Sequence, residues 1–178
     1  MYNKKKAFTL IEVIIVLALL TIVMGVIYQF FFSSNRDLND TDVKANLQFE
    51  GQQIQNSFTS YGSQGNTIRQ LNGNNPPPAD STERGIENLT LTLYAGTETV
   101  AYNYTSDNKT LTETHTKEDG TSATKTLSDK VDSIIVKPIG GNYVTATGMT
   151  IKVKLKDKGI SYGITSNIVF RNKGLTTQ

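Results

Sequence analysis

The sequence has no cysteine, a single histidine and four prolines, the first of them at position 76. The absence of cysteine excludes a disulfide framework, a thiolate metal site and a cysteine nucleophile. The lone histidine, His115, lies in a threonine-rich segment, so a surface position is favoured over a catalytic base or a metal ligand. P-loop, nucleophile-elbow, dinucleotide and acidic calcium-loop motifs are also missing. We therefore predict no enzymatic activity, no metal and no cofactor.

An excess of positive charge is confined to the start of the chain. The 178 residues include 18 Lys and Arg against 16 Asp and Glu, and three of the lysines lie within residues 1–7. The remainder holds 15 basic and 16 acidic residues, which argues against a general nucleic-acid or lipid-headgroup binder. The length suffices for one domain besides a membrane segment.

Residues 7–32 form an apolar run of 26 residues in which Glu12 is the only charge. At a rise of about 1.5 Å per residue, such a helix spans roughly 39 Å and crosses a hydrocarbon core of about 30 Å. Lys4, Lys5 and Lys6 precede it and predict an N-terminus on the cytoplasmic side. Tyr28 suits the outer interface.

Three interpretations of this segment compete. A cleavable secretory signal peptide fits poorly, because the apolar run is too long and no small-residue cleavage site follows it. A plain signal anchor explains the topology but not the order of residues around Glu12. A carboxylate in a membrane segment is rare without a partner, which makes Glu12 a functional candidate.

The run KKKAFTLIEVIIVLALL, residues 4–20, resembles the leader of type IV pilins and type II secretion pseudopilins. The resemblance implies cleavage after Ala7 by a prepilin peptidase, N-methylation of the new N-terminal Phe8, and assembly with other pilin subunits. It also implies a membrane-embedded assembly machinery and membrane lipid as the surroundings before assembly. Ala7 departs from the family, which usually has glycine before the cut.

Glu12 lies one helical turn from Phe8, so its carboxylate shares a face with the new α-amino group. In a bundle of such helices it would pair with the amine of a neighbouring subunit, strongly so in a medium of low dielectric constant. The alternative is a glutamate near the helix start that is favoured by the helix dipole and reaches the interface.

From residue 33 to 61 the pattern turns amphipathic, and the simplest prediction is one helix from about residue 8 to 60. The apolar face consists of Val43, Leu47, Ile54, Phe58 and Tyr61, at helical spacing. Gly25 and Gly51 are the predicted bend points, because glycine weakens a helix. Residues 62–85, rich in Gly, Asn and Pro, are predicted to be a linker with no helix or strand across its centre.

After residue 85 the apolar period becomes two, which predicts strands joined by local turns. The expected strands begin near Leu89, Val100, Thr110, Ala123, Val131, Met149 and Ile160. The fold class is therefore α+β: one long N-terminal helix, transmembrane and then amphipathic, packed against a mainly antiparallel sheet. The run YNYTSDNKTLTE (residues 102–113), the later apolar strand and the closing VFRNK (residues 169–173) resemble, over about half of this domain, the minor pilins and pseudopilins often labelled J or W. That likeness implies a minor, tip-located subunit.

Four lysines at a period of two, Lys152, Lys154, Lys156 and Lys158, share one face of a predicted strand. They would bind DNA phosphates or an anionic cell-surface polymer. The favoured alternative is an edge strand that uses lysine to block unwanted pairing.

Five segments follow: a leader (1–7), the transmembrane and assembly half of the helix (8–32), its amphipathic half (33–61), the linker (62–85) and a β-domain (86–178). The predicted protein is a structural subunit of a type IV pilus or pseudopilus, inserted in the cytoplasmic membrane and then exported in a filament. The rival is a membrane-anchored adhesin or DNA-binding module that does not polymerise.

Overall fold

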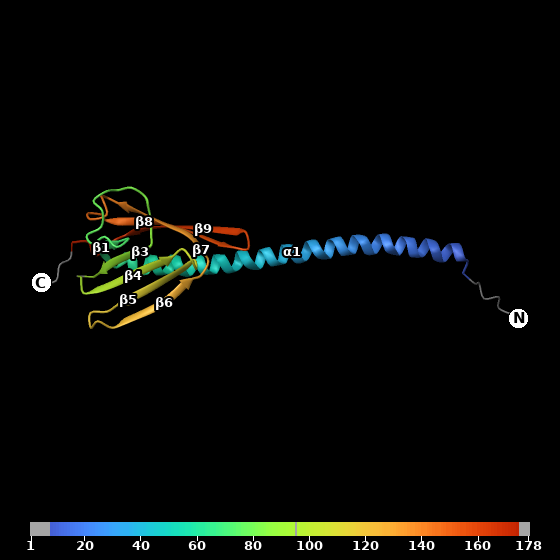
Figure 1. Ribbon diagram of the computed structural model, residues 1–178, viewed down its shortest axis with the longest axis horizontal. Coiled ribbons are helices and arrows are strands. Elements are labelled where there is room, and N and C mark those ends of the chain that lie inside the picture. The colour runs from blue at the N-terminus through green and yellow to red at the C-terminus, as the bar shows by residue number, and fades with distance from the viewer. Residues whose placement is uncertain (1–7, 95, 175–178) are drawn as a thin grey trace. The chain divides into compact units, whose positions relative to one another are not determined.

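The computed structural model describes residues 8–94 and 96–174, and Ala7, the expected cleavage residue, lies outside them. The chain divides into two compact units, Met1–Asp42 and Val43–Gln178. Helix α1 (Leu10–Ser63) contributes to both units, and strands follow it in the second (Figure 1). The strands are β1 (Gly65–Leu71), β2 (Arg84–Gly85), β3 (Asn88–Leu93), β4 (Glu98–Thr105), β5 (Thr110–Thr116), β6 (Ser122–Ser128), β7 (Val131–Ile139), β8 (Gly148–Asp157) and β9 (Ile160–Val169).

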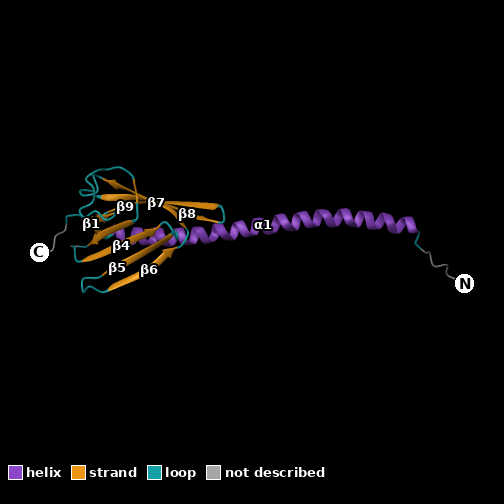
Figure 2. Ribbon diagram, in the orientation of Figure 1, coloured by secondary structure: helices purple, strands orange, loops and turns teal. Residues whose placement is uncertain are grey.

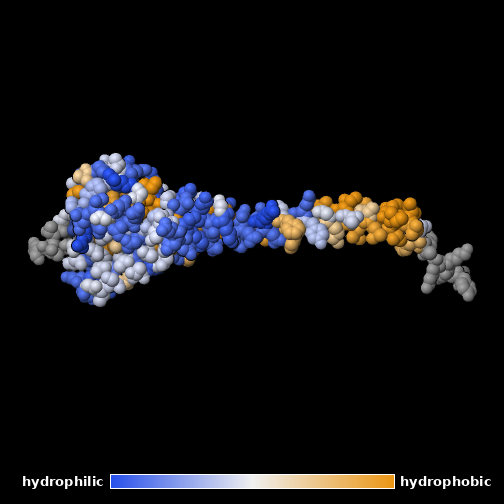
Figure 3. All heavy atoms as spheres, in the orientation of Figure 1, coloured by the Kyte–Doolittle hydropathy of each residue, from blue (hydrophilic) through white to orange (hydrophobic). Residues whose placement is uncertain are grey.

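In the first unit, helix α1 exposes its apolar side chains on every side. An 18-residue window reaches a mean hydropathy of 3.0, and none of it is buried. Leu10, Ile22 and Phe30 are 81%, 66% and 76% exposed. Figure 3 shows this part of the helix as largely orange, the colour of hydrophobic residues, with paler patches between. A helix that is hydrophobic all round suits lipid or the core of a larger assembly.

In the second unit, α1 buries a single stripe of its surface. The buried residues are Val43, Leu47, Gly51, Ile54, Phe58 and Gly62. Their spacing keeps them on one face, and the partly buried Tyr61 packs beside them. The predicted long helix and its apolar face are confirmed, with the helix ending at Ser63.

Gly51, one of the two predicted bend points, has a role in packing. A Cβ atom at Gly51 would lie 2.8 Å from a ring carbon of Tyr162, and one at Gly62 would lie 2.6 Å from Cγ2 of Ile168. Both contacts are shorter than van der Waals distance, so the missing side chains let β9 approach the helix backbone. Around Gly25, in contrast, a Cβ would meet nothing within 4 Å.

The β-domain contains two antiparallel sheets, whereas the sequence predicted one. The first has the order β1-β3-β4-β5-β6 and the second the order β2-β7-β8-β9 (Figure 2). The split comes after β6, because β7 pairs with β2 and β8 rather than with the preceding strand. Local turn signals do not show this, since they predict reversal of the chain but not the pairing of the strands on either side. The antiparallel character itself is confirmed.

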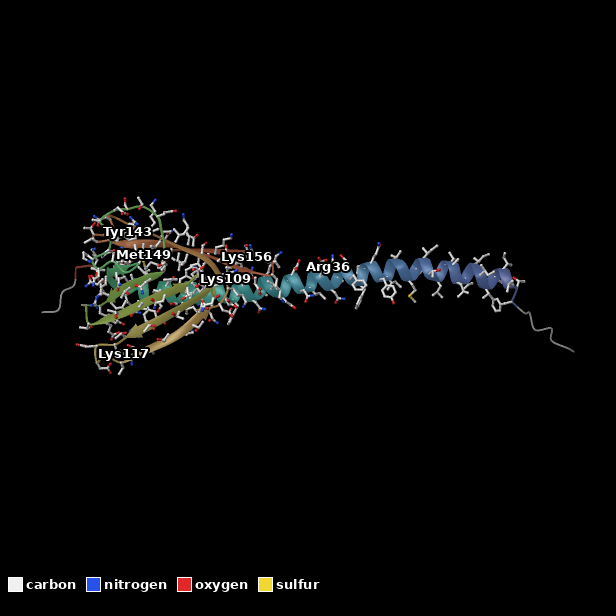
Figure 4. All side chains as sticks on the ribbon, in the orientation of Figure 1. Arg36, Lys109, Lys117, Tyr143, Met149 and Lys156 are labelled. Atoms are coloured by element: carbon white, nitrogen blue, oxygen red, sulfur yellow. The ribbon has the colours of Figure 1, made fainter. Side chains whose placement is uncertain are left out.

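The structure also differs from the expected linker at 62–85. Its first part forms strand β1, which pairs with β3 through contacts such as Ile68 with Leu91. Further along, the Asn72 side-chain amide donates to the carbonyl of Gly85 at 2.7 Å. The Tyr143 hydroxyl (labelled in Figure 4) lies 2.8 Å from the carbonyl oxygens of Thr82 and Val136 and donates to one of them at a time. These long-range contacts hold the proline-rich segment against the second sheet.

We expect Gly62→Val to destabilise the β-domain by about 1–3 kcal/mol, because the added side chain overlaps Ile168. The free energy of unfolding of the full chain in detergent, followed by denaturant titration, measures this. Gly25→Val, on the same helix with open space around it, is the matched control. Adding Ile168→Ala to Gly62→Val should restore part of the loss. A double variant no more stable than Gly62→Val would contradict the packing explanation.

Candidate functional site

The candidate assembly site lies at the start of helix α1, where Thr9 and Glu12 form a reciprocal cap. The Thr9 backbone N–H and hydroxyl each donate to Oε2 of Glu12 at 3.4 Å. In return, the backbone N–H of Glu12 donates to the Thr9 hydroxyl at 3.4 Å. This is the capping-box arrangement, in which a threonine before the first helical turn and a glutamate three residues later satisfy free amide groups.

The sequence carried the signal for this cap. Thr9-x-x-Glu12 before an apolar run is the T-x-x-E pattern of a helix start, a role for Glu12 besides the predicted dipole effect and docking role. The three side-chain bonds are near the long limit for hydrogen bonds, so each stabilises the cap weakly. Glu12 is therefore held locally, by weak contacts with Thr9.

Phe8 lies next to this cap and is 80% exposed. Phe8 precedes α1, which begins at Leu10, and Glu12 lies in the first turn of the helix, whereas the expected cleavage residue Ala7 is outside the described residues. Because Glu12 accepts hydrogen bonds from Thr9, its carboxylate already faces the N-terminal end of the helix. A cationic group arriving there would meet an acceptor rather than an apolar surface.

A second polar group fastens α1 to the first sheet. The Ser57 hydroxyl donates to the carboxylate of Glu113 and lies 3.1 Å from the hydroxyl of Tyr102. The Tyr102 ring in turn packs on Phe58, with ring centroids 4.0 Å apart. Burial, together with the negative charge of Glu113, raises the pKa of Tyr102. The pair Glu113 and Tyr102 is thus part of the core, and its polar atoms are satisfied from the helix.

A third contact joins the helix to the β6–β7 turn, where the two sheets separate. Glu50 accepts a hydrogen bond from Ser128 at 2.5 Å and forms an ion pair with Lys130. The hydrogen bond to Glu50 raises the pKa of Lys130. The side chains of Lys130 and Glu50 are 28% and 18% exposed, so the pair is shielded from water more than a surface ion pair. It fixes the point at which the chain leaves one sheet for the other.

The sequence favoured a surface position for His115, but the structure shows that its side chain is largely buried. Its side chain is 19% exposed, and its Nε2 lies 2.8 Å from a carboxylate oxygen of Glu98. The ring also packs on Tyr61, with centroids 5.1 Å apart. His115 points to the same side of β5 as Glu113, toward the helix. The many threonines around it gave no sign of this inward orientation. It occupies a packing and hydrogen-bonding position in the domain.

The four lysines of the predicted strand face differ in their surroundings in the structure. Lys152 pairs with Glu83 at 2.7 Å, and Lys154 pairs with Asp132 at 3.1 Å. The ammonium of Lys154 is the main cause of the lowered pKa of Asp132. Lys156 (labelled in Figure 4) is exposed on the same strand, and Lys158 lies in the following turn with a φ of 46°. The edge-strand alternative is wrong, because β8 lies between β7 and β9.

Residues 8–94 and 96–174 contain no group of three or more His, Asp or Glu placed to hold a metal ion. A polar cleft of about 420 Å³ opens between the helix and the first sheet, lined by Gln53, Asn56, Ser57, Ser60, Tyr61, Glu113 and Lys125. Its one buried acidic group, Glu113, already accepts the Ser57 hydrogen bond.

Residues 2–28 match the family model of the prokaryotic N-terminal methylation motif. The match covers the capped helix start and most of the apolar segment. It supports a type IV pilin-like or pseudopilin subunit, a class of structural proteins, and fits a membrane-anchored chain that assembles with other pilins. No curated protein and no solved structure matches this chain.

We expect the double variant Glu83→Gln with Asp132→Asn to bind duplex DNA more strongly at low salt. The reason is that each of these carboxylates forms an ion pair with a lysine of β8, Lys152 or Lys154. The dependence of binding on salt should become steeper as cations are freed. Mobility shifts at several salt concentrations measure both effects. The control, Glu118→Gln with Asp119→Asn, changes the net charge equally in a distant turn. Equal binding by the two double variants would show that the paired lysines are not a latent anion site.

Proposed function

We propose that the protein is a structural subunit, and a minor one of the J or W-like kind, of a type IV pilus or pseudopilus. A prepilin peptidase cuts after Ala7 and methylates Phe8, and the subunit then polymerises through the first part of α1. The observation that carries the proposal is a motif-matched helix start, with a weakly capped glutamate, on a helix whose apolar surface is unpartnered within the described residues.

The chemistry of assembly follows from the low dielectric constant around the helix. Cleavage leaves a positive α-amino group on Phe8, and a carboxylate four residues on, at Glu12, lies on the same side. An isolated charge in lipid is costly, whereas a pair formed between neighbouring subunits removes that cost for both. The pair also fixes the relative height of the two helices, since a shift along the axis separates the charges.

In this proposal the β-domain does not drive polymerisation and is displayed on the filament. Its polar groups are used in holding the helix and the two sheets together, as with Ser57, Glu113 and Glu50. Polymerisation therefore rests on the N-terminal helix, and the domain supplies the surface of the filament. The partners are other pilin subunits, the prepilin peptidase, the membrane assembly machinery and, before assembly, lipid.

Processing gives the first test. We expect the intact mass of the protein from producing cells to correspond to residues 8–178 plus one methyl group. The change Ala7→Gly should speed processing, because glycine is the usual residue before the cut in the family, and Ala7→Leu should block it. Mature protein that still carries residues 1–7 would sink the proposal and favour a membrane-anchored binding module.

Docking gives the second test. We expect Glu12→Ala to leave membrane insertion intact but to reduce incorporation into filaments more than a hundredfold, since losing one partner of a buried pair costs about 3–5 kcal/mol. Immunoblots of sheared filaments against membrane fractions measure this. Thr9→Ala is the control, because it removes the two hydrogen bonds of the Thr9 hydroxyl but keeps the carboxylate. If both variants lose incorporation equally, Glu12 acts only as a helix cap.

A further inference from the structure

The outer face of the first sheet carries an ordered array of hydroxyl groups. Strands β3, β4 and β5 turn Leu89, Leu91, Leu93, Val100, Tyr102 and Leu111 into the core, so the alternate residues point away from it. We call these outward residues the threonine face: Asn88, Thr90, Thr92, Thr99, Ala101, Asn103, Thr112, Thr114, Thr116, Ser122, Thr124 and Thr126.

The strand register places these residues in rows across the sheet. Thr114 stands between Ala101 and Thr124, and Thr116 stands between Thr99 and Ser122. Their hydroxyl groups form hydrogen bonds in pairs: Thr114 with Thr124 at 2.9 Å and Thr116 with Ser122 at 2.9 Å. Neighbouring rows are about 7 Å apart along a strand, and neighbouring strands are about 4.8 Å apart. The result is a grid of alternating hydroxyl and methyl groups.

The threonine face is open to solvent. None of its residues is buried: those on β6 are exposed, and those on β3, β4 and β5 are partly exposed. None of these described residues carries a charged or aromatic side chain. The charges of the β5–β6 hairpin lie in its turn, at Lys117 (labelled in Figure 4), Glu118 and Asp119, and at the paired positions Glu113 and Lys125, which alternate with the threonine face. In Figure 3 the region of β5 and β6 is accordingly pale, between the colours of hydrophilic and hydrophobic residues.

This composition excludes most classes of partner. A nucleic acid needs Lys and Arg, which the threonine face lacks. A protein interface is enriched in aromatic residues, Met and Arg, which are also missing from it. A charged polymer would lose its hydration here without gaining an opposite charge. What remains is a neutral partner that is itself dense in hydroxyl groups.

We propose that the threonine face binds a neutral polysaccharide in extended conformation. Each hydroxyl both donates and accepts, as sugar hydroxyls do, and each threonine methyl offers an apolar contact to the C–H face of a sugar ring. The side chains are stiff because they are β-branched and held in cross-strand pairs, so little conformational entropy is lost when a ligand binds.

Binding by a single subunit is weak, because each hydrogen bond contributes only about 0.5–1.5 kcal/mol net. Repetition strengthens it: a polymer of subunits presents many threonine faces to one chain of sugars, which raises the effective affinity. This step rests on the proposed filament function, whereas the binding face itself does not.

The test uses the full chain in detergent, immobilised densely on beads, so that avidity does not depend on filament formation. The probe is fluorescent hydroxyethyl cellulose, a soluble neutral glucan. We expect the unaltered chain to retain it, and Thr112→Val with Thr114→Val and Thr124→Val to retain at least about tenfold less, as expected for a loss of about 1.4 kcal/mol or more. The same three positions changed to serine keep the hydroxyl groups and should retain the probe.

The matched control is Thr165→Val with Ser161→Ala, which removes two exposed hydroxyls from the outer side of the second sheet. It should bind like the unaltered chain, and circular dichroism establishes that all variants are folded. No retention of the glucan by the unaltered chain, equal retention by the valine variant, or stronger retention of duplex DNA or polyglutamate would overturn the proposal. Because these outcomes are read on beads, they do not depend on whether the protein polymerises.

Discussion

The β-domain depends on the burial of one narrow stripe of helix α1 between Val43 and Gly62. Leu47, Ile54 and Phe58 are almost fully buried there, and each such side chain contributes about 1.5–3 kcal/mol by leaving water. Gly51 and Gly62 belong to the same stripe. Because they have no side chain, Tyr162 and Ile168 of β9 reach the helix backbone there. Both sheets are thus built on the same face of one helix, and the polar contacts of Ser57 and Glu50 hold it in position.

Upstream of that stripe the same helix has the opposite character. From Leu10 to Phe32 its apolar side chains are exposed, and the only charge is engaged in a weak cap with Thr9. In water such a surface would aggregate, so the helix needs lipid or other helices around it. An exposed apolar surface of this length fits a membrane-anchored subunit. In the proposed assembly step, a cation from a neighbouring subunit would replace the hydrogen bonds that Thr9 donates to Glu12.

Features of the fold can be predicted from the sequence where the determining signal is local and periodic. The long helix, its buried face and the positions of the strands from β3 to β9 follow from repeats of 3.6 and 2 residues. Prediction failed where partners come from far along the chain. The split into two sheets, the strand β1 within the supposed linker, the central position of β8 and the half-buried His115 all depend on pairings between distant segments. The cap at Thr9 is the exception among the missed features, because its pattern, Thr9-x-x-Glu12, is local and visible in the sequence.

By itself, the sequence determined the class of architecture and the character of the N-terminal helix, because apolar length, flanking lysines and a lone glutamate act through local physics. Only the tertiary structure decided what the remaining polar residues do. It paired Lys152 and Lys154 with carboxylates, gave Gly51 a role in close packing, and gathered threonines from four strands onto one open face. Strand register produces that face, and register is set by the burial of the opposite side chains against the helix.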